Sequence, residues 1–279
     1  MTLLLASDLD GTLLRSDGSV AAETAAALAR GRDGGLTIAF ATGRPPRWLH
    51  EVAEQTGHAG VAIGANGAVV YDLHAERVVH AEPLDVATVE LVTSRLRQAY
   101  PGVAFGMEYG LEFGHEPEYR HDWEVTPLAD RLGRLMPAPE VAPLAQLIDR
   151  PVLKVLAKWR EAPDPQAFMQ QAAELLQGAA MVTRSSEGPL LEISAPGITK
   201  ATGLAHLADS LGIGADDVVA VGDMPNDVPM LAWAGRSFAV ANAHPSVREA
   251  ADVVLPWSND EHAVARLIDQ LLSAPARAR

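Results

Sequence analysis

Short apolar runs recur along the chain, and each one ends at polar or glycine-rich positions. These runs predict buried strands, because they are too short for helices and have no polar side. The predicted strands cover residues 3–6, 36–41, 61–63, 218–221 and 253–255. The intervening segments predict helices over residues 20–32, 200–211, 227–234 and 261–272. Continuous apolar strands that alternate with helices are typical of a parallel sheet covered on both faces, so we expect an α/β, Rossmann-like core.

The middle of the chain has a different pattern of predicted helices, strands and linkers. Helices are predicted at residues 86–100 and 166–176, and strands at residues 103–107, 152–158 and 181–184. Proline-containing linkers separate several of these elements. We therefore expect an inserted α+β domain over residues 84–188, between two segments of one core, residues 1–83 and 189–279.

Composition and net charge exclude several classes of function for this protein. The formal net charge of -14 repels a phosphate backbone, which disfavours nucleic acid as a partner. The absence of cysteine excludes disulfides, zinc–thiolate sites and a cysteine nucleophile. No apolar run approaches the length of a membrane span, and the N-terminus has no signal-peptide pattern. We therefore expect a cytoplasmic protein with no membrane partner and no obligate protein partner.

Polar residues follow the predicted strands directly, where ligands bind in open parallel sheets. Asp8 and Asp10 follow the first strand, and a second acidic group follows residues 218–221. Any single Asp-Gly pair is ordinary turn chemistry, but two acidic clusters at strand ends favour a binding site. Paired carboxylates repel one another unless a cation or a proton intervenes, and an all-oxygen site suits Mg²⁺. The candidate positions at strand ends are Asp8, Asp10, Thr42, Asn66, Asp223, Asn226 and Asp227.

These residues carry a resemblance to a known family. The segment Asp-Leu-Asp-Gly-Thr-Leu-Leu at residues 8–14 resembles the first motif of the haloacid dehalogenase-like (HAD) hydrolases. Residues 41–44, Ala-Thr-Gly-Arg, resemble the second motif, and residues 198–200, Ile-Thr-Lys, resemble the third. The segment Gly-Asp-Met-Pro-Asn-Asp at residues 222–227 is similar to the fourth motif of the Cof-type subfamily. The large insert between the second and third motifs is also similar to that subfamily, in which it forms a cap domain.

The resemblance implies catalytic roles for the matching residues. Asp8 is implied as the nucleophile that forms an aspartyl-phosphate, and Asp10 as the general acid and base. Thr42 and Lys200 are implied as ligands of the transferring phosphoryl group.

Metal and substrate ligands follow from the same resemblance. Mg²⁺ is implied to bind Asp8, the backbone carbonyl of Asp10 and Asp223, with Asp227 as a direct or water-mediated ligand. The expected substrate contacts are Thr42, Gly43, Arg44, Asn66, Lys200 and Asn226. Substrate choice is expected to depend on the cap, with Met107, Glu108 and Tyr109 as candidates by position.

Several of these residues have a plain structural alternative. Thr42 alone is more often a helix N-cap, and Lys200 alone is more often a solvated surface residue. Arg44 fits phosphate binding and surface packing equally well. Asn66 is also typical of a turn. His115 and His121, in an acidic stretch of the insert, are expected to be solvated rather than catalytic.

The leading hypothesis is a Mg²⁺-dependent phosphatase of small phosphorylated metabolites, with sugar phosphates as the favoured class. A phosphomutase on the same core is the nearest enzymatic alternative. A non-catalytic sensor of phosphorylated metabolites is the alternative from another functional class. Both carboxylates of the first motif are present, and a sensor could lose either one without losing the fold.

Overall fold

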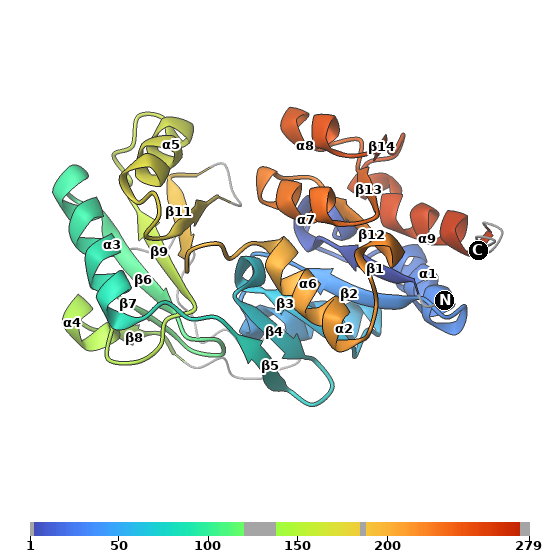
Figure 1. Cartoon of the computed structure of the whole chain (residues 1–279), viewed down its shortest axis with the longest axis horizontal. Helices are drawn as coiled ribbons and strands as arrows, with labels where there is room; N and C mark the ends of the chain where they lie inside the picture. The colour runs from blue at the N-terminus through green and yellow to red at the C-terminus, as the bar shows by residue number, and fades with distance from the viewer. Residues whose placement is uncertain (1–2, 120–137, 185–187, 274–279) are drawn as a thin grey trace.

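The structure, a computed structural model, describes residues 3–119, 138–184 and 188–273. Within these ranges the chain forms two sheets, each with its own helices (Figure 1). No described helix is long and apolar enough to cross a membrane.

The larger sheet has eight strands in the order β14-β13-β12-β1-β2-β3-β4-β5. The run from β14 to β3 is parallel, and β4 and β5 are added as antiparallel strands. The strands are β1 (Leu4–Ser7), β2 (Thr37–Ala41), β3 (Val61–Gly64), β4 (Val69–Asp72), β5 (Arg77–Ala81), β12 (Val218–Gly222), β13 (Arg236–Ala239) and β14 (Val253–Val254). The central strands β1 and β12 are buried along their whole length, which explains why their sequences are continuously apolar. This arrangement confirms the predicted α/β core.

Two groups of helices cover this sheet. Helix α1 packs against α2 and α9, whereas α7 packs against α6 and α8. Strand order runs outward from β1 in both directions, and right-handed crossovers then place the two groups on opposite faces. The helices are α1 (Ala22–Asp33), α2 (Leu49–Thr56), α6 (Lys200–Ser210), α7 (Val228–Trp233), α8 (Pro245–Ala250) and α9 (Ala263–Ser273). The point of reversal lies beside β1, where a doubly wound sheet leaves room for a ligand.

The smaller sheet has six strands in the order β10-β11-β9-β6-β7-β8. Its strands are β6 (Ala104–Glu108), β7 (Phe113–His115), β8 (Glu140–Val141), β9 (Lys154–Lys158), β10 (Met181–Thr183) and β11 (Leu190–Ser194). Its helices are α3 (Val86–Ala99), α4 (Leu144–Leu147) and α5 (Pro165–Leu175). Alternate residues such as Phe105, Val155 and Ile193 share one apolar core with α3 and α5. The other face of the sheet carries buried charged residues, among them Glu108, Lys154 and Glu192.

The structure differs from the sequence predictions at several points. Strand β11 belongs to the smaller sheet, so we place the end of the insert after Ser194 rather than at residue 188. Strand β13 and helix α8 were not predicted. The expectation that His115 is solvated is wrong: it is buried, and its Nδ1 lies 2.7 Å from the carbonyl oxygen of Glu116. His121 lies outside the described residues.

Candidate active site

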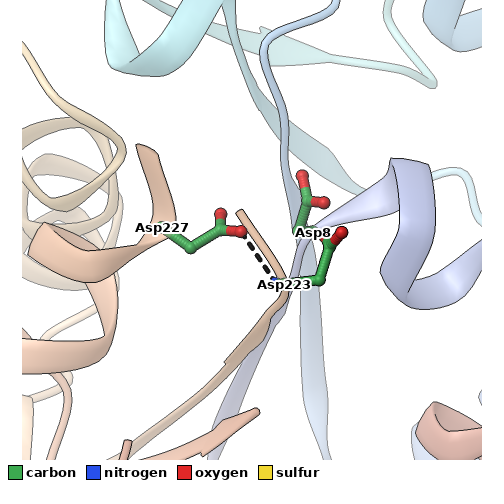
Figure 2. Close-up of side chains that lie close together, drawn as sticks. All are labelled: Asp8, Asp223 and Asp227. Atoms are coloured by element: carbon green, nitrogen blue, oxygen red, sulfur yellow. Dashed lines mark hydrogen bonds between the residues drawn. The ribbon is translucent and has the colours of Figure 1, made fainter. Parts of the chain in front are cut away.

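Three carboxylates meet at the carboxyl ends of β1 and β12. Asp8 directly follows β1, Asp223 directly follows β12, and Asp227 lies in the turn that leads into α7 (Figure 2). One oxygen from each of the three lies within 4.8 Å of the others, and all three residues are buried. The structure therefore brings together the two acidic clusters that are more than two hundred residues apart in the sequence.

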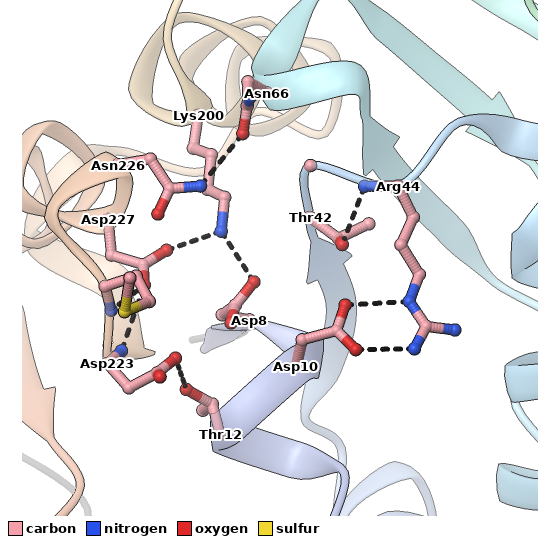
Figure 3. Close-up of polar contacts among 12 residues, drawn as sticks. Asp8, Asp10, Thr12, Thr42, Arg44, Asn66, Lys200, Asp223, Asn226 and Asp227 are labelled. Atoms are coloured by element: carbon pink, nitrogen blue, oxygen red, sulfur yellow. Dashed lines mark hydrogen bonds and ion pairs between the residues drawn. The ribbon is translucent and has the colours of Figure 1, made fainter. Parts of the chain in front are cut away.

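Lys200 lies between two of these carboxylates. Its Nζ donates to Oδ1 of Asp8 and to Oδ1 of Asp227, both at 2.6 Å (Figure 3). The residue opens helix α6, whose N-cap is Thr199, and only 1% of its surface is exposed. A cation is unfavourable at a helix N-terminus, and the two carboxylates compensate for that cost. The surface alternative for Lys200 is thus wrong.

Burial and mutual repulsion raise the pKa values of Asp8 and Asp223. Burial raises the pKa of Asp8 well above its usual value; Lys200 opposes this shift, and Asp227 and Asp223 add to it. Burial, reinforced by Asp227, raises the pKa of Asp223 to about 6, against a hydrogen bond from Thr12. Burial lowers the pKa of Lys200, but Asp227 and Asp8 outweigh it, so the pKa is raised overall. Three carboxylates share one ammonium group, and the site therefore favours a further positive charge.

Short turns fix the geometry of the carboxylates. The hydroxyl of Thr12 donates to Oδ1 of Asp223 at 2.8 Å. The backbone N–H groups of Asp223 and Met224 both donate to Oδ2 of Asp227 at 3.0 Å. Gly11 has a φ of +77°, and a Cβ there would lie 2.3 Å from Oδ2 of Asp223. Close approach of the first-motif turn to Asp223 therefore requires glycine at this position.

Asp10 points away from the three-carboxylate cluster and toward the loop after β2. Its two carboxylate oxygens accept from Nε and Nη2 of Arg44, at 2.8 Å and 2.5 Å. Its side chain is 55% exposed, whereas that of Arg44 is 23% exposed. The side chain of Asp10 is thus not part of the cluster, and the half-buried Arg44 is paired with Asp10 rather than spread over the outer surface.

The loop after β2 contributes Thr42 and Gly43. Thr42 is buried, and its Oγ1 accepts from the backbone N–H of Arg44 at 3.1 Å. The following helical segments have Pro45 and Trp48 as N-caps, so the interpretation of Thr42 as a helix N-cap is wrong. The carbonyl of Gly43 accepts from Nζ of Lys154 in β9 at 2.7 Å. This contact joins the smaller sheet to the loop.

The turn after β3 makes a second connection to the smaller sheet. Asn66 is buried, has a φ of 58°, and accepts from Nδ2 of Asn226 at 3.0 Å. Its own Nδ2 donates to Oγ1 of Thr183 at 3.1 Å and to Oε2 of Glu192. Asn66 therefore serves as a turn residue and also bridges the two sheets.

The donor set fits a divalent cation with a preference for oxygen ligands. Asp8 and Asp223 offer carboxylate oxygens in a buried place with excess negative charge, and no nitrogen or sulfur ligand is among them. Both oxygens of Asp227 are already engaged, by Lys200 and by two backbone N–H groups. Asp227 is therefore better placed to orient Asp223 and Lys200 than to bind a metal ion alone.

Of the three candidates for substrate selection in the insert, Met107, Glu108 and Tyr109, only Glu108 faces the larger sheet. Met107 lies in the apolar core shared with α3 and α5, and the hydroxyl of Tyr109 donates to the carbonyl of Leu147 at 2.6 Å, so neither faces the larger sheet. Glu108 faces it and pairs with Arg47, whose Nη2 donates at 2.9 Å. The residues that sequence reasoning missed are Arg47, Lys154, Thr183 and Glu192.

Comparisons with known proteins agree with this geometry. Residues 5–268 match the family of haloacid dehalogenase-like hydrolases. The chain belongs to this family.

Curated relatives within the family are matched along nearly their full length. The pyridoxal phosphate phosphatase YbhA of Escherichia coli is 27% identical, over 96% of this chain and 97% of its own. The 5-amino-6-(5-phospho-D-ribitylamino)uracil phosphatase YwtE of Bacillus subtilis is also 27% identical, over 96% and 98%. The two relatives are thus phosphatases of different substrates, although each matches this chain over nearly its full length.

Solved structures show the same two-sheet arrangement. A haloacid dehalogenase-like hydrolase of Bacillus subtilis superposes with a TM-score of 0.81 at 25% identity, covering 96% of this chain and 99% of the other. The phosphatase BT1666 of Bacteroides thetaiotaomicron gives a TM-score of 0.78 at 25% identity, covering 97% and 95%. The likeness includes the smaller sheet, because it covers nearly the whole chain.

Proposed function

We propose that this hydrolase is a Mg²⁺-dependent phosphatase of small phosphorylated metabolites, with sugar phosphates as the favoured class. The observation that carries the proposal is the buried group of Asp8, Asp223 and Asp227 around Lys200. Such a group concentrates the charges that phosphoryl transfer requires, since catalysis there rests mainly on positioning and electrostatics. The curated relatives support the proposal, because both act on phosphate esters of small molecules.

The first half of the reaction forms a covalent intermediate on Asp8. A carboxylate oxygen of Asp8 bonds to phosphorus while the bond from phosphorus to the ester oxygen breaks. The departing oxygen takes a proton from the carboxyl group of Asp10, which Arg44 holds beside the loop that carries Thr42. The products of this half are the free alcohol and the aspartyl-phosphate.

The second half returns Asp8 to its starting state. A water oxygen bonds to phosphorus while the bond to Asp8 breaks, and the ionised Asp10 accepts a proton from that water. Phosphate leaves, and Asp10 is protonated again. Each proton that Asp10 gives in the first half is thus recovered in the second.

Other side chains hold the phosphoryl oxygens. Lys200 provides a fixed ammonium group beside Asp8. The Thr42 hydroxyl accepts from the backbone N–H of Arg44 and donates to no other described residue, so its hydrogen is available to a phosphoryl oxygen. Mg²⁺, held by Asp8, Asp223 and the carbonyl of Asp10, would add positive charge to the same oxygens. We further propose that the smaller sheet is the cap of this site, since Lys154 and Glu192 contact the loops that carry Thr42 and Asn66.

The experiment compares two asparagine variants by rapid-quench burst kinetics with Mg²⁺ present. Asp8→Asn should form no phosphoenzyme with any substrate, because it lacks the attacking oxygen anion. Asp10→Asn should lose more first-step rate on a sugar phosphate than on p-nitrophenyl phosphate, whose acidic leaving group needs little protonation. The phosphoenzyme should then accumulate, because Asp10 also activates water.

Three outcomes would contradict the proposal. Full turnover after confirmed metal removal would exclude the Mg²⁺ requirement. Transfer of the phosphoryl group to a second hydroxyl without release of phosphate would indicate a mutase. Binding of phosphorylated metabolites with no phosphoenzyme would indicate a sensor.

A further inference from the structure

Lysine is rare in this chain, and its placement is unusual. Only three of the 22 basic residues are lysines, at positions 154, 158 and 200. Lysine is ordinarily among the most exposed residues, yet these three are 2%, 8% and 1% exposed. Lys200 belongs to the carboxylate cluster, and the other two lie on one face of β9. All three lysines of the chain are thus buried, and Lys154 and Lys200 contact the loops of the proposed site.

Lys154 forms part of a polar group that spans both sheets. Its Nζ donates to the carbonyl of Gly43 at 2.7 Å and lies 3.5 Å from Oε1 of Glu192. Glu192 lies on β11, which pairs with β9, and also accepts from Asn66. Gly43 follows Thr42, and Asn66 follows the adjacent strand, so this group lies directly beside the proposed phosphate site.

Some hydrogen-bonding capacity in this region is unused among the described residues. Oδ1 of Asn226 and Oγ of Ser194 are buried and have no hydrogen-bond partner there. Asn226 binds Asn66, and Ser194 is two residues from Glu192 on the same face of β11. Buried polar atoms without partners are costly, so a water molecule or a polar ligand is expected to complete the group.

We propose that Lys154 and Glu192 bind a hydroxyl group of the substrate's leaving group, and so select alcohols that carry further hydroxyls. This inference rests on the proposed phosphatase function and deepens it. A hydroxyl accepts from the ammonium of Lys154 and donates to the carboxylate of Glu192, which a partner of either single type cannot do. The separation of 3.5 Å between these two groups is long for a direct contact, so a bridging hydroxyl requires only a small opening.

Other leaving groups fit this place less well. An anionic leaving group is attracted by Lys154 but repelled by the carboxylate of Glu192. A cationic leaving group is attracted by Glu192 but repelled by Lys154, so neither charge is favoured. An unsubstituted alkyl chain offers no hydrogen bond to Lys154 or Glu192, so separating these two groups to admit it brings no compensating contact. The best match is a neutral leaving group with several hydroxyls.

The test uses two primary alkyl phosphates that differ only in hydroxyl groups, sorbitol 6-phosphate and n-hexyl phosphate. The measured quantity is the ratio of their kcat/KM values with saturating Mg²⁺. We expect the wild-type ratio to exceed about 10, and Glu192→Gln and Lys154→Met each to lower it about tenfold or more, the loss of one charged hydrogen bond. The double variant should lower the ratio little further, because the two residues bind the same hydroxyl.

A matched control is Glu140→Gln in β8, which removes a cap carboxylate that pairs with Arg150 and is 45% exposed. Its ratio should equal that of the wild type. If Glu192→Gln and Lys154→Met slow both substrates equally, the pair is only structural and the inference is overturned. A wild-type ratio near 1 with ready turnover of both phosphates also overturns it. Absence of turnover on both, and on p-nitrophenyl phosphate, would instead reject the proposed function.

Discussion

Arg44 donates to both carboxylate oxygens of Asp10, from Nε at 2.8 Å and from Nη2 at 2.5 Å. The pair connects the turn after β1 with the loop after β2, and the backbone N–H of the same arginine binds the hydroxyl of Thr42. Arg44 thus fixes the position of one proposed catalytic group and of one proposed phosphate ligand. A planar guanidinium suits this task, because its fork matches a carboxylate at two points.

The first prediction concerns the replacement of Arg44. Arg44→Ala should lower kcat/KM about 10- to 100-fold, the loss of charged hydrogen bonds that position Asp10. Arg44→Lys should recover only part of this loss, because an ammonium makes a single point contact. The control is Arg30→Ala, which removes an equally two-pronged pair with Asp269 on the surface. Equal kinetics for Arg44→Ala and Arg30→Ala would show that the Asp10 pair has no catalytic consequence.

The second prediction concerns metal affinity and pH. Burial and Asp227 raise the pKa of Asp223 to about 6, so a proton competes with the metal ion below that pH. The apparent Kd for Mg²⁺ should rise as the pH falls, by about tenfold or more per pH unit below pH 6, because the pKa of Asp8 is raised as well. Thr12→Val should move this transition to higher pH, because it removes the hydrogen bond that stabilises the ionised form. Calorimetric titration from pH 5 to pH 8 measures both; an unchanged midpoint in the variant would contradict the assignment to Asp223.

Much of the larger sheet and its site could be predicted, because each strand and the polar residue that follows it are neighbours in the sequence. The apolar run of β1 ends at Asp8 and that of β12 ends at Asp223, and parallel strands bring their carboxyl ends to one edge. The positions of Thr42 and Asn66 follow by the same rule. Strand β13 was missed because its four residues include an arginine and a serine, which hide the apolar pattern.

The polar face of the smaller sheet could not be predicted in this way. In β9 the alternation of Lys154 and Lys158 with apolar residues is typical of a strand with one solvated face. Both lysines are buried because another part of the chain lies over that face, and this is a tertiary fact that a local pattern does not contain. The rarity of lysine in the whole sequence was the one available signal. For the same reason the membership of Glu192 in this face became visible only with the pairing of β11.

The third prediction separates backbone strain at a glycine from steric conflict with Asp223 at the proposed metal site. Gly11 and Gly18 have nearly equal φ values, +77° and +76°, but a Cβ at Gly18 has no neighbour within 4 Å. Replacement by alanine should cost about 1 kcal/mol of unfolding free energy from strain at either position. Only Gly11→Ala should also displace Asp223 and weaken Mg²⁺ binding at least tenfold. Denaturant unfolding and metal titration of both variants decide this; equal Mg²⁺ affinities would mean that the turn yields without moving Asp223.

The fourth prediction concerns His58, a buried residue in the loop between α2 and β3. His58 is 3% exposed, and its ring centroid lies 4.4 Å from that of Phe40. Burial, with a smaller contribution from Arg32, lowers its pKa to about 4, from 6.5 in the unfolded chain. The unfolded state therefore binds a proton between pH 6.5 and pH 4 that the folded state does not, and acid favours unfolding over this range.

The size of this effect follows from the two pKa values. The stability that His58 confers by remaining neutral is fully present above pH 6.5 and should fall by about 3 kcal/mol as the pH reaches 4. His58→Leu should remove this part of the pH dependence, because leucine does not titrate and suits the apolar surroundings of Phe40. The free energy of unfolding of wild type and variant is to be measured from pH 4 to pH 8 with chelator present, so that the contributions of Asp8 and Asp223 cancel in the difference. The difference should change steadily between pH 6.5 and pH 4 and be flat above pH 7. A difference that is constant over the whole range would mean that His58 has the same pKa in the folded and the unfolded protein, which contradicts the prediction.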